Sequence, residues 1–169
     1  MNSFKQSLEE MEELAGFLAE DLENVQRVIS FAEENSLEMD FEVHAKAETC
    51  EESAEHSPVS LDQIVKTLVF IGEKPVAVLC PGSQRVDTEK LEDILDTDVR
   101  MADPDEVKEA TGYPIGAVSP FDLEIPVFME ESLLEEDLLR PAAGSRAVGA
   151  EITPEELTKV TDRQIDVKD

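Results

Sequence analysis

The sequence predicts a single domain of the α+β class, on three observations. The chain has 169 residues, a length that suits one domain better than two. Hydrophobic residues make up 41% of it, which is enough to build a sizeable core. Segments with helical and with strand-like apolar spacing are interleaved along the chain, without an internal repeat or a linker long enough to separate domains.

The first predicted element is an amphipathic helix, or a pair of helices, near the N-terminus. Apolar residues between Leu8 and Ile29 recur every three or four positions, which places them on one helical face. Asn35 is a suitable helix stop. The apolar face packs on the domain or, alternatively, forms the seam of a dimer, so we expect a monomer or a weak dimer.

Short strands and helices are predicted through the middle of the chain. The spacing of apolar residues predicts strands at 40–45, 67–71 and 76–80. The last two are joined by Gly72–Pro75, a turn signal. Short helices are expected at 47–56 and 61–66.

The C-terminal half continues this alternation. Helices are predicted at 88–95, after the cap Asp103 and after the cap Thr153. Strands are predicted at 99–102, 126–130, 147–152 and in the tail from Asp162. The stretch 111–120 is rich in Gly and Pro and is expected to be a loop, and 143–146 is expected to be a turn.

The net charge is extreme, at -27 from 41 acidic and 14 basic residues. The regular apolar patterning argues against a disordered acidic chain, and mimicry of a nucleic acid stays an alternative. Acidic residues spread along the whole chain favour a protein of a salt-rich cytoplasm, as in halophilic microbes, where salt screens the charges. Residues 58–100, with eight acidic and five basic residues, are the least repulsive place for an anionic ligand.

The composition disfavours several classes of protein. No apolar run approaches the ~20 residues that span a bilayer, and the N-terminus lacks the pattern of a signal peptide, so we expect a cytoplasmic protein. Cys50, Cys80 and two histidines are too few and too scattered for a structural zinc site, which needs about four clustered ligands. No phosphate-binding loop, dinucleotide fingerprint or Ser–His–acid order is present, and we predict no cofactor.

Three places are candidates for a ligand site, and each also has an ordinary structural explanation. Lys66 precedes a predicted strand, where it offers an ammonium to a phosphate or carboxyl group or is a plain exposed base. Gly116 and Pro120 bound a loop that aims backbone groups at a ligand or is only a turn. Gly144 and Arg146 bring backbone and a guanidinium to an anion or mark a hairpin turn.

Several segments, taken in order, resemble one known family. They are Gln63–Phe70, Met101–Val107, Thr111–Phe121, Ala143–Val148 and Thr153–Leu157. In this order and at this spacing, the set is similar to the YbaK/prolyl-tRNA synthetase-associated editing domain family. The resemblance begins near Leu22, so residues 1–21 are expected to form a helical extension and residues 22–169 the editing domain.

The resemblance implies a compact α+β domain with a central mixed, largely antiparallel sheet and surrounding helices. It implies a deacylase that acts in trans on the acceptor end of mischarged tRNA, with or without an aminoacyl-tRNA synthetase. The expected amino acids are small, such as Ala, Ser or Cys. It also implies catalytic roles for Lys66, Gly116 and Pro120, and a substrate-binding set of Ala117, Val118, Ser119, Gly144, Ser145 and Arg146.

Under this hypothesis the loop backbone positions water and stabilises the oxyanion, a ribose hydroxyl assists proton transfer, and Lys66 anchors the terminal adenosine or its phosphate. No side-chain base is assigned. Ala117 stands where many relatives carry His or Gly, and Gly149 where some carry Asp, which leaves the substrate open. The alternatives are a non-catalytic tRNA-binding or regulatory paralogue, and a protein-interaction module that uses the N-terminal helix.

Overall fold

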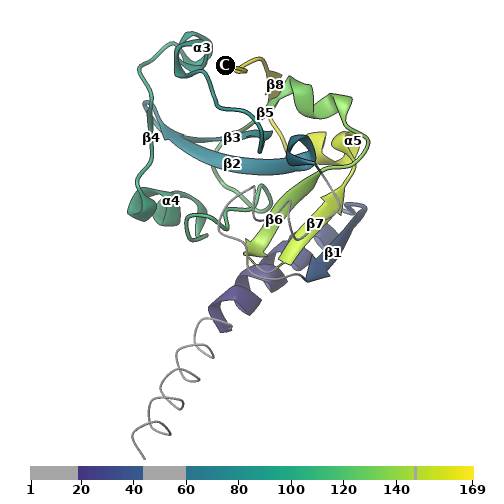
Figure 1. Ribbon diagram of the computed structural model, residues 1–169. Coiled ribbons are helices and arrows are strands. Elements are labelled where there is room, and N and C mark those ends of the chain that lie inside the picture. The colour runs from purple at the N-terminus through teal and green to yellow at the C-terminus, as the bar shows by residue number, and fades with distance from the viewer. Residues whose placement is uncertain (1–18, 44–59, 147) are drawn as a thin grey trace, which may run out of the picture.

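The computed structural model describes residues 19–43, 60–146 and 148–169, which form one mixed sheet with helices packed against it (Figure 1). The strands are β1 (Met39–Val43), β2 (Ile64–Ile71), β3 (Pro75–Pro81), β4 (Arg100–Met101), β5 (Val127–Glu130), β6 (Arg140–Ser145), β7 (Val148–Ile152) and β8 (Arg163–Ile165). The helices described are residues 19–34, α3 (Thr88–Leu95), α4 (Pro104–Thr111) and α5 (Pro154–Thr158), with 3-10 turns η1 (Leu61–Gln63) and η2 (Glu131–Glu135).

The strand order within the described residues is β1-β7-β6-β2-β3-β5-β8, and β4 pairs with β2 off this path. The antiparallel pairs are β1–β7, β6–β7, β2–β3 and β2–β4. The parallel pairs are β2–β6, β3–β5 and β5–β8. The predicted α+β class and mixed sheet are therefore confirmed, with antiparallel pairs in a slight majority among those described.

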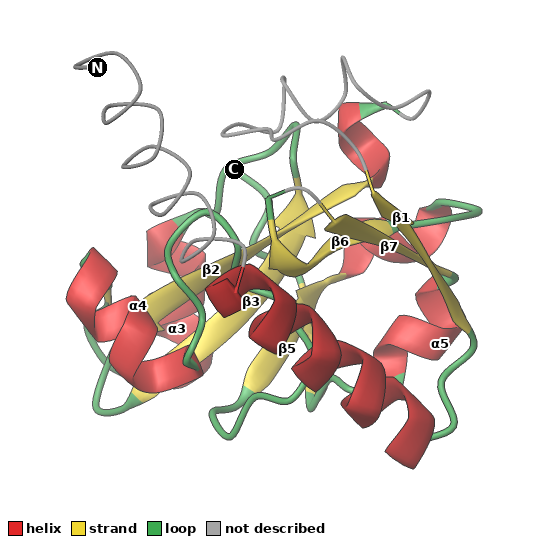
Figure 2. Ribbon diagram, turned by 90° about the horizontal axis from the view of Figure 1, so that it is seen from below, coloured by secondary structure: helices red, strands yellow, loops and turns green. Residues whose placement is uncertain are grey.

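The β2–β3 hairpin lies at the centre of the sheet and separates two apolar clusters. Alternate residues of a strand point to opposite faces, so Val65 and Val69 join the larger cluster, whereas Leu68 and Phe70 join the smaller one. The larger cluster also receives one buried side chain each from helix 19–34, α4 and α5, namely Val28, Val107 and Leu157. The smaller cluster is covered by α3. Figure 2 shows helix 19–34 running across the face of the strands.

The predicted capping residues begin these helices in the structure. Asp103 and Glu106 form a capping box at the start of α4, and Thr153 accepts a hydrogen bond from the first turn of α5. Helix 19–34 ends one residue before Asn35, as the sequence predicts. Each cap satisfies backbone N–H groups that have no partner within the helix.

One predicted helix is wrong. Residues 61–66 were expected to be helical, but only Leu61–Gln63 form a 3-10 turn, and β2 begins at Ile64. The cause is pairing across the sheet, because Ile64 and Val65 lie opposite Arg140 and Pro141 of β6. Lys66 is therefore inside the strand rather than before it.

The turn expected at 143–146 is shorter than predicted. Ala143–Ser145 belong to β6, which pairs with β7 through a register shift between Ala142 and Ser145. Arg146 alone of the expected segment is in a turn. Ala143, Gly144 and Ser145 are instead buried, and the last two lie against helix 19–34.

Some expectations lie outside the described residues, namely the helix at 47–56 and the apolar stripe before residue 19. Within residues 19–43, 60–146 and 148–169, no helix has the length and apolar character needed to cross a bilayer.

The ion pair between Arg100 and Glu106 predicts a pH-dependent contribution to stability. Two hydrogen bonds of 2.7 and 2.8 Å from Arg100 lower the pKa of Glu106 to about 2. A carboxyl group with a depressed folded-state pKa stabilises the fold above its unfolded-state pKa and loses this effect as the pH falls through the folded value. We expect the difference in unfolding free energy between wild type and Glu106→Gln to be constant near neutral pH and to vanish between about pH 5 and about pH 2. Urea denaturation at fixed ionic strength measures it.

The glutamine variant is a controlled change, because its side chain still accepts the hydrogen bond that Asp103 N–H donates at 3.1 Å. A difference that persists unchanged to pH 2 would contradict the pairing.

Candidate functional site

Lys66 is the third residue of β2 and lies opposite Cys80 of β3. Alternation along the strand places its side chain on the same face as Leu68 and Phe70. Its Nζ donates a hydrogen bond of 2.5 Å to the backbone carbonyl of Gln84, in the segment between β3 and α3. Because an ammonium carries three donors, this bond orients Lys66 and leaves it able to bind a further acceptor.

A row of polar groups supports the segment that holds Lys66. The Gln84 amide Nε2 donates to Ser132 Oγ at 3.3 Å, and Ser132 N–H donates to the carboxylate of Glu130 at 2.8 Å. Glu130 is 1% exposed, so its carboxylate is fixed at the end of β5. The position of the Lys66 ammonium is therefore tied to a buried part of the sheet.

The loop after α4, residues 112–121, is hereafter called the glycine–proline loop. Gly116 is exposed and has φ of +85°, a conformation that favours glycine. The next residues turn inward: Ala117 is 2% exposed and Ser119 is fully buried, and Val118 belongs to the larger apolar cluster. The side chains of these three predicted substrate-binding residues are therefore buried, and the exposed part of the loop here is the backbone around Gly116.

Arg146 lies against the exposed end of this loop. Its Nη2 donates to the carbonyl of Ile115 at 3.2 Å. A Cβ added at Gly116 would stand 2.8 Å from the same nitrogen, which is closer than real Cβ contacts. The glycine thus provides the space that the guanidinium occupies.

The end of β6 is pressed against helix 19–34. Gly144 has φ of +90°, and a Cβ there would lie 2.8 Å from the backbone carbon of Asn24. The next residue, Ser145, donates its hydroxyl to Asp21 at 2.5 Å. Gly144 and Ser145 therefore fix the strand end from which Arg146 reaches the loop.

The structure brings some of the predicted site residues together and separates others. Gly116 and Arg146 are in contact, and Gly144 and Ser145 position Arg146. Lys66 points to the opposite face of β2 from Val65 and Val69, which pack with the glycine–proline loop.

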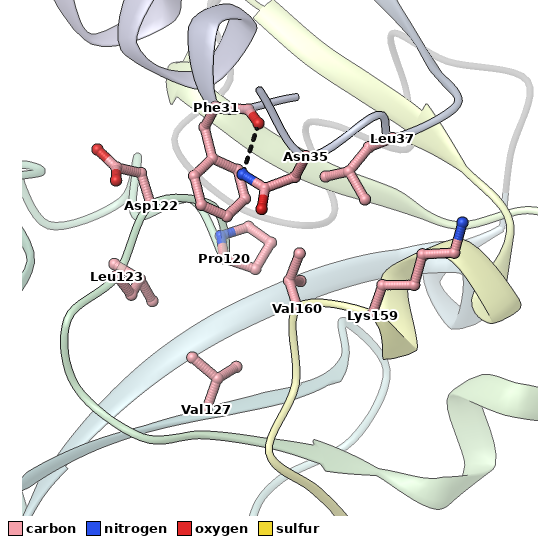
Figure 3. A pocket seen from close by; sticks show the side chains of 9 residues that line it. All are labelled: Phe31, Asn35, Leu37, Pro120, Asp122, Leu123, Val127, Lys159 and Val160. Carbon is pink, nitrogen blue, oxygen red and sulfur yellow. Dashed lines mark hydrogen bonds between the residues drawn. The ribbon is translucent and has the colours of Figure 1, made fainter. Parts of the chain in front are cut away.

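Pro120, at the far end of the loop, lines a pocket of about 130 Å³ rather than the surface beside Arg146 (Figure 3). Its other walls combine apolar and polar side chains from the end of helix 19–34 and the residues after it, the residues after the loop, the start of β5 and the residues after α5, namely Phe31, Asn35, Leu37, Asp122, Leu123, Val127, Lys159 and Val160. Among the described residues, no group of three His, Cys, Asp or Glu side chains is placed to hold a metal ion.

Sequence reasoning missed the residues of helix 19–34 that touch the site. Asp21 binds Ser145, Asn24 contacts Gly144, and Arg27 binds both ends of the glycine–proline loop. One signal was present, because Arg27 keeps helical spacing with Asn24 and Phe31 in a segment with few basic residues. Gln84 was also missed, since it acts on Lys66 through its backbone carbonyl, which every residue type has.

Comparison with known proteins shows which family the chain resembles. Residues 44–160 match the model of the aminoacyl-tRNA editing domain family. YwhH of Bacillus subtilis (strain 168), an uncharacterized protein, is 36% identical over 122 residues, which cover 70% of this chain and 78% of YwhH. EbsC of Enterococcus faecalis, a candidate Cys-tRNA(Pro)/Cys-tRNA(Cys) deacylase, is 30% identical over 128 residues, which cover 73% of this chain and 76% of EbsC.

Proline–tRNA ligases match over a smaller region. That of Solidesulfovibrio magneticus is 36% identical over 88 residues, which are 50% of this chain and 15% of the ligase. Among solved structures, a candidate trans-editing enzyme for prolyl-tRNA synthetase superimposes with a TM-score of 0.79 at 31% identity, covering 86% of this chain and 97% of that one.

The contact between Gly116 and Arg146 predicts a specific effect of Gly116→Ala. The backbone conformation alone should cost about 1–2 kcal/mol of unfolding free energy, because a side chain at this φ is strained. The guanidinium should add to this cost, because it has to leave its place on the loop. Chemical denaturation of the variant measures the sum.

The double variant Gly116→Ala/Arg146→Ala separates the two causes. We expect the alanine at position 116 to cost less when Arg146 is absent, because only the backbone strain then remains. An equal cost in both backgrounds would show that the guanidinium does not rest against Gly116.

Proposed function

Since the chain belongs to the aminoacyl-tRNA editing domain family and is therefore an aminoacyl-tRNA hydrolase, we propose that it removes a small amino acid, such as Ala, Ser or Cys, from mischarged tRNA. The observation that carries the proposal is the exposed, glycine-containing end of a packed loop with a guanidinium beside it. The resemblance to EbsC over 73% of this chain supports action in trans as a separate protein.

The reaction needs groups that act on an ester carbonyl. Water adds to the carbonyl carbon, the bond to the ribose oxygen breaks, and that oxygen takes a proton from the water, directly or through the neighbouring ribose hydroxyl. Negative charge develops on the carbonyl oxygen on the way. Backbone N–H groups near Gly116 would stabilise it at no reorganisation cost, because the loop is already packed in place. Arg146 would hold the aminoacyl ester against the loop.

Lys66 serves in this proposal as an anchor for the terminal nucleotide. Alternation along β2 puts its side chain on the other face from Val65 and Val69. Its ammonium is oriented by Gln84, so it would suit a phosphate or the adenosine better than the reacting carbonyl. An aminoacyl-adenosine has its phosphate and its ester at opposite ends of the ribose, so one substrate would offer its phosphate to Lys66 and its ester to the loop. Binding at a distance from the ester fixes the geometry of the reaction.

The remaining proposals concern the setting of the reaction. The editing domain would comprise residues 22–169, with 1–21 as an extension, and the protein would work in the cytoplasm. Related domains occur within proline–tRNA ligases, so a synthetase would be a natural partner at the tRNA acceptor end.

The net charge of -27 predicts an unusual response to salt. Most tRNA-binding proteins lose affinity as salt rises, because they release counterions from phosphates. Here long-range repulsion between an acidic protein and tRNA should dominate at low salt, and screening within about 3 Å at 1 M should remove it. We expect kcat/KM on mischarged tRNA to rise between 0.1 and 2 M KCl, measured with Ala-, Ser-, Cys- and Pro-tRNA.

Circular dichroism at each KCl concentration serves as the control, since it separates a gain in folding from a gain in association. A kcat/KM that falls with salt would contradict the proposed adaptation. A protein that is folded at molar KCl yet cleaves none of these substrates would support the non-catalytic tRNA-binding hypothesis instead.

The proposed anchoring role of Lys66 predicts a loss of activity on its removal that removal of Lys74 does not cause. Lys66→Ala should lower kcat/KM on the order of 10- to 100-fold, the loss expected for a hydrogen bond to a charged group. Lys74→Ala removes the same charge from the exposed turn of the same hairpin and should act like wild type. Steady-state deacylation of the preferred tRNA measures both, and a wild-type rate for Lys66→Ala would refute the anchoring role.

A further inference from the structure

One arginine of helix 19–34 ties together the two ends of the glycine–proline loop. Arg27 Nη1 donates to the carbonyl of Thr111 at 2.9 Å, just before the loop. Its Nη2 and Nε donate to the carbonyl and the carboxylate of Asp122, just after the loop, at 2.5 and 2.7 Å. A planar guanidinium with several fixed donors suits such a bridge, whereas a lysine has a single charged nitrogen.

A second link lies just inside the first, between Tyr113 and Phe121. The buried hydroxyl of Tyr113 donates to the carbonyl of Phe121 at 2.8 Å. Burial raises the pKa of Tyr113 to about 12, so this hydroxyl stays a donor at every pH at which the protein would work. The guanidinium carbon of Arg27 lies 4.2 Å from the centre of the Tyr113 ring, a cation–π distance. The two links therefore support each other.

The backbone is shaped to admit the arginine. Gly112, which ends α4, has φ of +79°, and a Cβ there would lie 2.7 Å from Arg27 Nη1. Any other residue at this position would push the guanidinium away from Thr111. The helix also contacts the loop exit through Phe31, whose ring centre is 6.3 Å from that of Phe121.

We propose that Arg27 is a positioning residue for ester hydrolysis, which fixes the base of the glycine–proline loop through Thr111, Tyr113 and Asp122 and thereby holds the backbone at Gly116 in its working geometry. This inference rests on the proposed function. Oxyanion stabilisation depends on donors that are held in place before the reaction, and a small misplacement of such groups lowers the rate strongly. Helix 19–34, which is distant in sequence from the glycine–proline loop, would then position the groups that act on the ester.

Arg27 could instead serve only to dock helix 19–34 on the domain, and a control has to separate this structural role from the positioning role. Val28, the next residue, is fully buried in the larger cluster and makes no hydrogen bond through its side chain. Val28→Ala is therefore a matched control that weakens docking of the same helix while leaving the guanidinium in place. Arg27→Met removes the hydrogen bonds and keeps much of the aliphatic volume.

The experiment is single-turnover deacylation by the full chain at molar KCl, with thermal denaturation of every variant. Arg27→Met should lower the saturating rate on the order of 10- to 100-fold while the half-saturating enzyme concentration changes little. Guanidinium ion added at millimolar concentration should restore part of the rate of Arg27→Met and none of that of Val28→Ala. The rate of Arg27→Lys should be lower than that of Arg27→Met with added guanidinium. Tyr113→Phe should also lower the rate relative to wild type.

A second readout does not depend on turnover. Ala117 N–H donates to the carbonyl of Pro114 at 3.1 Å, so amide exchange there reports on the loop. Arg27→Met should raise its exchange rate at least about tenfold over that of Val28→Ala, once both are corrected for stability. A wild-type protein without turnover would refute the proposed function. The exchange result would still decide whether Arg27 holds the glycine–proline loop in place. Equal rates or equal exchange in Arg27→Met and Val28→Ala would overturn the inference.

Discussion

The close approach of helix 19–34 to the end of β6 is the constraint on which the site depends. At Gly144 the helix backbone comes so near that no side chain fits between them. This contact sets the position of the helix, and the helix in turn carries Asp21 to Ser145 and Arg27 to the glycine–proline loop. The same strand end carries Arg146 to Gly116. The contact of Gly144 with the helix backbone therefore positions both arginines that bind the glycine–proline loop, Arg27 and Arg146.

The elements that the sequence predicted correctly are those decided by local chemistry. The β2–β3 hairpin follows from two apolar runs around a Gly–Pro turn, and α4 follows from Asp103 and Pro104 at its start. Such signals act between residues that are neighbours along the chain, and no other part of the fold has to be known. The family resemblance extended this to the mixed sheet, because a set of ordered segments fixes a topology that single segments do not.

The errors arose where distant residues decide the outcome. Lys66 lies inside β2 because it pairs with Cys80 of β3, and because Ile64 and Val65 before it pair with β6, more than seventy positions away along the chain. The stretch Ala143–Ser145 has the composition of a turn, yet pairing with β7 and the pressure of a helix make it a buried strand. The face on which Lys66 emerges follows from that pairing, so the sequence did not predict the direction of its side chain. Arg27 escaped notice for the same reason, since its partners are 84 and 95 positions away.

Basic side chains are few in so acidic a chain, and two of the arginines bridge separate segments. The side chain of Arg140, 14% exposed, joins Glu42 of β1 to Glu151 of β7, and Arg27 joins the two ends of the loop. Taking such charges out of water is costly, and a half-buried pair adds little stability compared with apolar packing. A planar guanidinium does, however, fix the angle and separation of the groups that it bridges. These arginines are therefore best understood as setting geometry, one between strands β1 and β7 and one at the base of the loop that Arg146 touches.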